Sequence, residues 1–171
     1  METSLREQCQ AFGESRLAVA KEAKTPEDWV RLWKDPAYPY TFRWGTCWTF
    51  CIEYKVEDFA AEIGFFLDIL GLDSNALGAD FAMLMSPDNM FYFAVKPAQE
   101  GGSTPPDAIR LQFMLSDLLE TAAELEKRGV EFESEPQPVE PDSPLYHGLF
   151  RTPHGIAVDL WGLVERQVHR G

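Results

Sequence analysis

Apolar and polar residues alternate along two short segments of the chain, and an aspartate follows each segment. Residues 51–56 read Cys-Ile-Glu-Tyr-Lys-Val and precede Asp58, while residues 110–115 read Arg-Leu-Gln-Phe-Met-Leu and precede Asp117. A period of two is typical of a β-strand whose two faces meet different surroundings. Both segments therefore predict a strand that leads through an aspartate into a helix.

Helical periodicity follows each aspartate. Over residues 58–70 the apolar residues recur at spacings of three, four and seven, and Gly71 ends the pattern. In the second copy, Asp117 and Glu120 predict a capping box at the start of the helix. Further strands are predicted near 79–86 and 90–96 in the first half, with residues 73–78 as a short additional strand before them, and near 130–134, 145–152 and 156–162 in the second half. A proline-rich loop is expected from Glu135 to Pro144.

The ordered duplication predicts two similar modules, each a strand, a helix and three strands. One helix leaves a face of its sheet uncovered, so we expect the two sheets to curl around a shared cavity. The predicted domain spans residues 46–165, with module one at 46–96, a linker at 97–107 and module two at 108–165. Residues 1–45 form a predicted N-terminal helical extension.

The extension is predicted to contain two helices. The first covers residues 4–22. The second has Thr25 as its cap and Pro26 in its first turn, and it ends near Asp35.

Composition narrows the classes of protein that the chain can belong to. At 171 residues and 45% hydrophobic, it can bury one sizeable core. A net charge of −13 disfavours nucleic acid and anionic membranes as partners, although it is compatible either with simple solubility or with a cationic ligand. No apolar run approaches the roughly eighteen residues that a membrane span requires, and no signal peptide is evident, so a cytoplasmic location is expected. The three cysteines form no CxxC pair, which predicts reduced thiols.

Several motifs resemble those of the vicinal-oxygen-chelate superfamily, the glyoxalase, bleomycin-resistance and extradiol-dioxygenase group. They are the two strand-to-aspartate openings, the helix ending Leu70-Gly71-Leu72, and residues 150–160. That last segment is similar to the family's aromatic-x-Asp-Pro-x-Gly-x-x-x-Glu-Leu ending, with Thr152 and Asp159 as departures. The resemblance covers residues 48–163. It implies an α+β fold of two tandem βαβββ modules in a U-shaped, cup-like mixed sheet, and it implies a homodimer.

The resemblance also identifies the four positions at which family members bind a divalent ion. In this chain they hold Cys51, Phe93, Arg110 and Asp159. A guanidinium is always protonated and a phenyl ring has no lone pair to donate, so two of the four cannot be ligands. One thiol and one carboxylate are too few for a catalytic metal site. The sequence therefore predicts no metal and no cofactor.

Alternation along the strands predicts which side chains face the cup. If Cys51 faces inward, Glu53 does too, and we expect Phe91, Phe93 and Val95 to share this orientation. The predicted ligand-binding residues are Cys51, Glu53, Phe93, Arg110, Gln112, Asp159 and Trp161. Aromatic walls with a few polar groups are typical of a small-molecule pocket. In the alternative, Arg110 forms an internal salt bridge with Asp159 or Glu53 that holds the modules together and binds nothing.

Two functions remain open at this stage. The first is a metal-independent small-molecule binding protein of the glyoxalase/bleomycin-resistance type, which holds an organic ligand in an aromatic-lined cup. The alternative is a lyase, isomerase or dioxygenase-like enzyme with an altered active site. There Glu53, Asp159 or His147 would move a proton, and Arg110 would steady an enolate or a carboxylate. A weaker variant uses a Cys51 thiolate whose pKa is lowered beside Arg110.

Overall fold

The computed structural model describes residues 22–33, 42–43 and 50–164. The chain divides into two compact units, Met1–Trp44 and Gly45–Gly171. The predicted helix at residues 4–22 lies almost wholly outside the described residues. None of the helices in the described ranges is long and apolar enough to cross a membrane.

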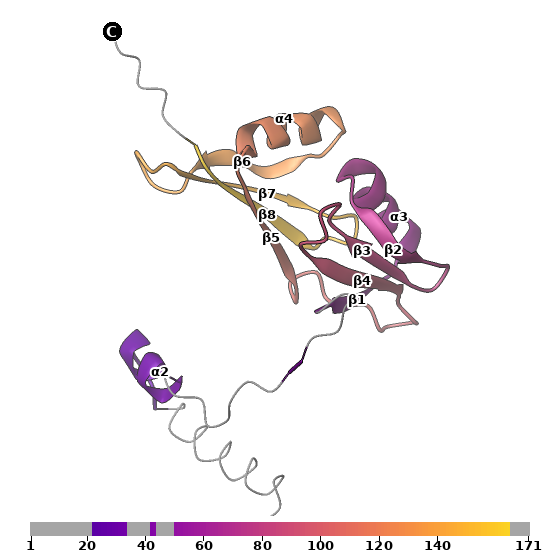
Figure 1. Cartoon of the computed structure of the whole chain (residues 1–171), viewed down its shortest axis with the longest axis horizontal. Helices are drawn as coiled ribbons and strands as arrows, with labels where there is room; N and C mark the ends of the chain where they lie inside the picture. The colour runs from indigo at the N-terminus through magenta and orange to yellow at the C-terminus, as the bar shows by residue number, and fades with distance from the viewer. Residues whose placement is uncertain (1–21, 34–41, 44–49, 165–171) are drawn as a thin grey trace, which may run out of the picture. The chain divides into compact units, whose positions relative to one another are not determined.

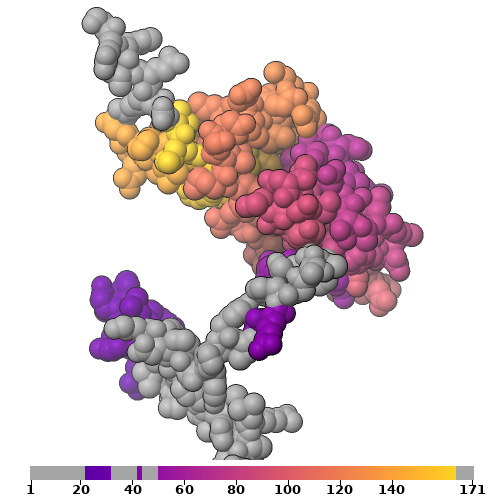
Figure 2. All heavy atoms as spheres, viewed as in Figure 1, coloured from indigo at the N-terminus to yellow at the C-terminus, as the bar shows by residue number. Residues whose placement is uncertain are grey.

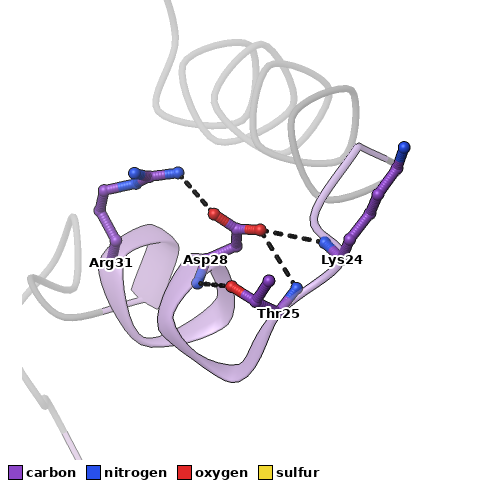
Figure 3. A network of polar contacts seen from close by, with 4 residues as sticks. All are labelled: Lys24, Thr25, Asp28 and Arg31. Atoms are coloured by element: carbon purple, nitrogen blue, oxygen red, sulfur yellow. Dashed lines mark hydrogen bonds and ion pairs between the residues drawn. The ribbon is translucent and has the colours of Figure 1, made fainter.

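The described part of the first unit contains helix α2 (Pro26–Trp33). Thr25 caps it as predicted, because its Oγ1 accepts a hydrogen bond from the Asp28 backbone N–H at 3.2 Å. Asp28 Oδ2 accepts in return from the backbone N–H groups of Thr25 and Lys24, each at 3.1 Å (Figure 3). These backbone hydrogen bonds lower the pKa of the Asp28 carboxyl. The start of α2 is therefore encoded by local sequence alone.

Module one lies in the second unit and contains the elements that its sequence pattern predicts. They are β1 (Ile52–Val56), α3 (Phe59–Gly64), the π-helical turn η1 (Phe65–Ile69), β2 (Asp73–Leu77), β3 (Ala82–Met85) and β4 (Tyr92–Pro97). The strand order is β1-β4-β3-β2, with β1 parallel to β4. Asp58 begins α3 by accepting a hydrogen bond from Ala61 N at 3.0 Å. Gly71 follows η1 with a φ of 74°, a conformation that glycine adopts without steric cost.

Module two repeats this order. Its elements are β5 (Arg110–Leu115), α4 (Leu118–Lys127), β6 (Phe132–Pro138), β7 (Leu145–Arg151) and β8 (Ala157–Leu163). The strand order is β5-β8-β7-β6, with β5 parallel to β8. The fold is therefore α+β, with two tandem βαβββ modules and one four-stranded sheet in each (Figure 1).

Two local predictions for module two are wrong. The loop expected from Glu135 is still strand as far as Pro138. This is possible because β6 is an edge strand, where a proline leaves no ladder hydrogen bond unmade. The capping box also does not form: the Asp117 side chain makes no capping bond, and one of its carboxylate oxygens accepts from Thr121 Oγ1 at 3.2 Å instead.

Two clusters of buried apolar side chains form the core, and Phe65, Leu70 and Leu111 pack against both of them. In the space-filling view the two modules lie directly against each other (Figure 2). Ile156, beside the turn between β7 and β8, is fully buried in the core of module one. Phe65 of η1 packs against Phe150 of β7, with ring centroids 6.1 Å apart. In addition, Arg128 at the end of α4 donates to the Ile69 backbone carbonyl at 2.8 Å. The modules are therefore fixed relative to each other by side chains from both.

A buried carboxylate also joins the modules. Glu62 of α3 has no exposed surface. It accepts hydrogen bonds from Tyr54 Oη of β1 and from the His154 backbone N–H of module two, each at 2.9 Å. Burial, and then the nearby Glu62 charge, raise the pKa of the Tyr54 phenol well above its usual range. Tyr54 is therefore held as a protonated donor to Glu62.

Candidate ligand-binding site

A pocket of about 380 Å³ opens where the first residues of β1, β4 and β5 come together. Its walls are mainly aromatic and aliphatic. They are formed by Phe50, Ile52, Tyr54, Asn89, Met90, Phe91, Tyr92, Phe93, Ile109, Arg110, Leu111, Gln112 and Phe113. A larger depression of about 770 Å³ lies beside Ser116 and Leu163, but its lining contains no aromatic side chain among the described residues. The smaller pocket therefore has the character of a small-molecule site.

Three phenylalanines form the aromatic wall of this pocket. Phe91 and Phe93 are stacked, with ring centroids 6.2 Å apart and planes inclined by 15°. Phe91 also contacts Phe113 of β5 at 5.4 Å, so the wall crosses from module one to module two. The mouth of the pocket is apolar as well, because Phe50 and Met90 are 64% and 80% exposed. Exposed apolar groups around a concave surface are typical of an interaction site.

Phe93 lies on the opposite face of its sheet from the one predicted. In the parallel pairing of β1 and β4, Phe93 is in register with Ile52 and Val95 with Tyr54. Phe93 therefore shares the face that α3 and η1 cover, and its ring contacts that of Phe66 at 4.9 Å. Cys51 and Glu53 lie on the other face, since side chains alternate along a strand. The expectation that Phe91, Phe93 and Val95 share a face with Cys51 is wrong.

Arg110, at the start of β5, lines the pocket and contacts a buried carboxylate. Its Nε lies 3.1 Å from Oδ2 of Asp159 in β8, and this Asp159 side chain is 1% exposed while that of Arg110 is 55% exposed. The contact is an ion pair without hydrogen-bond geometry, because Oδ2 has no hydrogen-bond partner. Both residues belong to module two. This ion pair therefore does not join the modules, contrary to the salt-bridge alternative.

His147 of β7 binds the other oxygen of the same carboxylate. Its Nε2 lies 2.6 Å from Asp159 Oδ1. The imidazole also lies against the Trp161 ring, with centroids 4.3 Å apart, because His147 and Trp161 are opposite each other in the β7–β8 pairing. The Trp161 Nε1 atom is buried and has no hydrogen-bond partner. Asp159 is thus the centre of a polar cluster formed by Arg110, His147 and Trp161.

Gln112 belongs to both the pocket and the polar cluster's face of the sheet. It lines the pocket, and it is in register with Asp159 across the parallel pairing of β5 and β8. Arg110 and Gln112 therefore connect the pocket to the sheet face that carries Asp159 and Trp161.

Cys51 and Glu53 do not line the pocket. Glu53 forms an exposed ion pair with Lys96 of β4, with Nζ 3.0 Å from Oε2. Burial, and then the Glu53 charge, raise the pKa of the Cys51 thiol. This direction contradicts the lowered pKa that a Cys51 thiolate beside Arg110 would need, because the charged neighbour is an anion.

The four positions that bind metal in the family do not assemble a donor set here. Phe93 is packed in the core, and Cys51 precedes β1 of one sheet while Asp159 lies in β8 of the other. The two Asp159 oxygens face His147 and Arg110. Among the described residues, no three histidine, cysteine, aspartate or glutamate side chains are grouped so that they could hold an ion. These residues do not fit a chelated divalent metal.

Sequence reasoning missed the part that Ile52, Leu111 and Phe113 have in the pocket. Each lies on the face of its strand opposite to the predicted ligand-binding residues of that strand. The three residues reach the pocket because β1 and β5 are edge strands of their sheets. No signal in the sequence identifies which edges of the two sheets meet.

No family model matches the chain, and no curated protein sequence matches it either. Among solved structures, a glyoxalase/bleomycin resistance protein/dioxygenase from Nocardioides is 19% identical, with a TM-score of 0.55 over 83% of this chain and 95% of that one. An integron cassette protein from the mobile metagenome of Halifax Harbour sewage outfall is 18% identical, with a TM-score of 0.55 over 67% and 97%. TnmS3, an antibiotic binding protein from Streptomyces, is 19% identical, with a TM-score of 0.52 over 66% and 93%.

These likenesses establish the fold. The chain has the fold of the vicinal-oxygen-chelate superfamily, as its duplicated motifs predict.

Proposed function

We propose that this protein binds a small organic molecule in the pocket between β1, β4 and β5, without a metal ion. The observation that carries this proposal is the composition of the pocket, in which three phenylalanine rings and an apolar mouth surround Arg110 and Gln112. Its volume of about 380 Å³ is within the range of small-molecule sites, roughly 300–1,000 Å³. Apolar walls supply affinity in such a site, and a few polar groups orient the ligand.

Two further findings support a binder that works without metal. TnmS3, which has the same fold, is an antibiotic binding protein. The Cys51, Phe93, Arg110 and Asp159 positions offer too few donors for an ion, so a ligand has to be held by direct contacts.

A pair of substitutions tests where the ligand binds. Ile52 is 48% exposed at the pocket, and Leu77, at the end of edge strand β2, is 57% exposed away from it. Ile52→Trp should fill the pocket, whereas Leu77→Trp adds the same side chain elsewhere. A ligand at a hundred times its Kd stabilises the protein by about 2.7 kcal/mol, which a thermal-shift screen of aromatic compounds detects. Hits should disappear in Ile52→Trp and persist in Leu77→Trp. Equal hits in both variants would contradict the proposed site.

A second function, proton transfer in an altered active site, is favoured by the contact between His147 and Asp159. A carboxylate that holds one imidazole nitrogen leaves the other available as a base. His147 Nδ1 has no hydrogen bond to a described residue. Incubating the protein with each compound found in the screen, and following the compound by NMR, separates the two functions. A binder returns the compound unchanged, whereas an enzyme converts it and loses the conversion, with binding intact, in His147→Gln.

A further inference from the structure

The charged side chain in the lining of the pocket is opposite in sign to the net charge of the whole chain. Arg110 is the one charged side chain in its lining as described, while the chain's net charge is −13. We infer that the ligand is an aromatic anion, most simply a carboxylate, and that Arg110 binds its charged group. This inference rests on the proposed function and names the ligand class for the same pocket.

Arg110 is oriented so that part of its guanidinium is available. Asp159 engages Nε, and the two terminal nitrogens make no hydrogen bond to a described residue. More than half of the side chain is exposed. A guanidinium presents its donors in a planar fork that matches a carboxylate. Because Asp159 is buried in β8, it holds the fork at the pocket wall.

Carboxylates near the pocket are not available to a cationic ligand. Asp159 is 1% exposed and already faces Arg110 and His147. Glu53 is paired with Lys96 and lies on the other face of its sheet. Asp88, in the turn beside the mouth, accepts a hydrogen bond from Met90 N at 3.2 Å and is not part of the lining. A cation in the pocket would therefore meet Arg110 without a partner of opposite sign.

The net charge does not reverse this preference. At physiological salt, charges are screened over about 8 Å, so distant surface carboxylates act only weakly on a bound ligand. Arg110 is in the wall itself, where a partly desolvated charge interacts more strongly than it would in water. The net negative charge therefore slows the approach of an anion more than it weakens the bound state.

The aromatic wall of the pocket selects the rest of the ligand. The Phe91 ring packs against both of the others, with centroid distances of 6.2 Å to Phe93 and 5.4 Å to Phe113. A flat aromatic ligand gains offset-stacked or edge-to-face contacts there, in addition to buried area. The wall and Arg110 together therefore suit a planar ring that carries a carboxylate.

Three probes of one shape test the inference on the full chain by isothermal titration calorimetry. They are 2-naphthoate, the neutral 2-naphthamide and the cationic 2-naphthylmethylammonium. The wild type should bind naphthoate at least about tenfold more tightly than naphthamide, which corresponds to one charge-assisted hydrogen bond. It should bind the cation most weakly. Arg110→Met should abolish this preference while keeping the affinity for naphthamide.

Arg151 provides the matched control. It is an exposed arginine of β7 whose Nε lies 2.6 Å from Glu133, and it is outside the pocket. Arg151→Met should keep the full preference for naphthoate. Arg110→Lys keeps a positive charge beside Asp159 and so guards against loss of folding, and it should reduce the preference without abolishing it, because lysine lacks the fork.

The outcomes separate this inference from the function on which it rests. Equal affinity of the wild type for naphthoate and naphthamide, or a preference that survives in Arg110→Met, overturns the anion inference and leaves the proposed pocket standing. Tighter binding of the cation than of naphthoate also overturns the anion inference and leaves the proposed pocket standing. If none of the three probes binds, or if Ile52→Trp binds them as well as the wild type does, the proposed pocket itself is wrong.

Discussion

Asp159 and His147 form a 2.6 Å contact between Oδ1 and Nε2 across neighbouring strands β8 and β7, and the carboxylate is 1% exposed. Arg110 approaches the second oxygen, but its side chain is half exposed. Arg110 and His147 therefore differ in solvent exposure, and this difference determines how much each interaction with Asp159 contributes to stability.

His147→Phe should cost more stability than Arg110→Met. The first removes a hydrogen bond to a buried carboxylate, worth about 1.5–3 kcal/mol. The second removes a half-exposed ion pair that water screens, worth under about 1 kcal/mol. The free energy of unfolding in urea, measured for both variants, checks the order. If Arg110→Met costs more, the ion pair and not the histidine stabilises the buried Asp159.

Tyr54 should make the protein's stability fall above pH 10. Burial and Glu62 raise the pKa of this phenol above its ordinary value of 10.0. The folded state therefore keeps a proton that the unfolded state loses, and the contribution is fully present below pH 10 and declines as the pH rises beyond it. Tyr54→Phe should flatten this decline in unfolding free energies measured between about pH 8 and 11.

The same variant has a second effect that is independent of this titration. At neutral pH, Tyr54→Phe removes one of the two hydrogen bonds that buried Glu62 accepts from described residues, and it should cost about 1–3 kcal/mol. An alkaline decline as steep as that of the wild type would show that Tyr54 is not its source.

Gly162 should tolerate no side chain. A Cβ there would lie 2.6 Å from the Leu118 Cβ and 2.9 Å from the Leu115 backbone oxygen, where β8 passes beneath α4. Gly162→Ala should therefore cost roughly 1–3 kcal/mol through overpacking. Gly64, which has helical backbone angles and Asp68 Oδ2 at 4.0 Å as the nearest atom, is the control. Gly64→Ala should be neutral or should stabilise by up to about 1 kcal/mol. Thermal melts of the two variants that coincide would contradict this account of the α4–β8 packing.

Removing metal should leave ligand binding unchanged. The positions that bind an ion in the family offer one thiol and one carboxylate, contributed by Cys51 and Asp159. Titrations of 2-naphthoate before and after treatment with EDTA should give the same Kd. Elemental analysis of the purified protein should find no stoichiometric Zn, Mn, Fe or Ni. One tightly held ion per chain would overturn the metal-free proposal.

Much of the fold could be predicted because its signals are local. Alternation marks β1 and β5, the Asp58 carboxylate caps α3, and Gly71 and Gly129 adopt positive φ where the helices end. Each of these depends on residues within one turn or a few positions along a strand. The second helix also begins after Asp117 as predicted, but its capping box does not form, because the Asp117 carboxylate accepts a hydrogen bond from Thr121 Oγ1 instead.

The site could be predicted only in part. Alternation establishes which residues of one strand share a face, but the face of β4 that matches β1 depends on the register of Ile52 with Phe93, which are joined by non-local hydrogen bonds. Phe93 was therefore placed on the wrong face. Phe93 lines the pocket from the helix-covered face of its sheet, and the alternation of residues along β4 does not predict this.

The sequence by itself determined a duplicated α+β chain, because the periodicity of strands and helices and the identity of turn residues depend only on residues that are close together in the sequence. Only the tertiary structure decided that Arg110 shares Asp159 with His147 inside one module, and that phenylalanines from both modules meet beside it. His147 and Asp159 lie on consecutive strands, but Arg110 and Asp159, and the phenylalanines of the two modules, lie on strands or loops that are distant in the chain. Which of them meet is decided by the pairing and packing of whole sheets, and no local pattern records that choice.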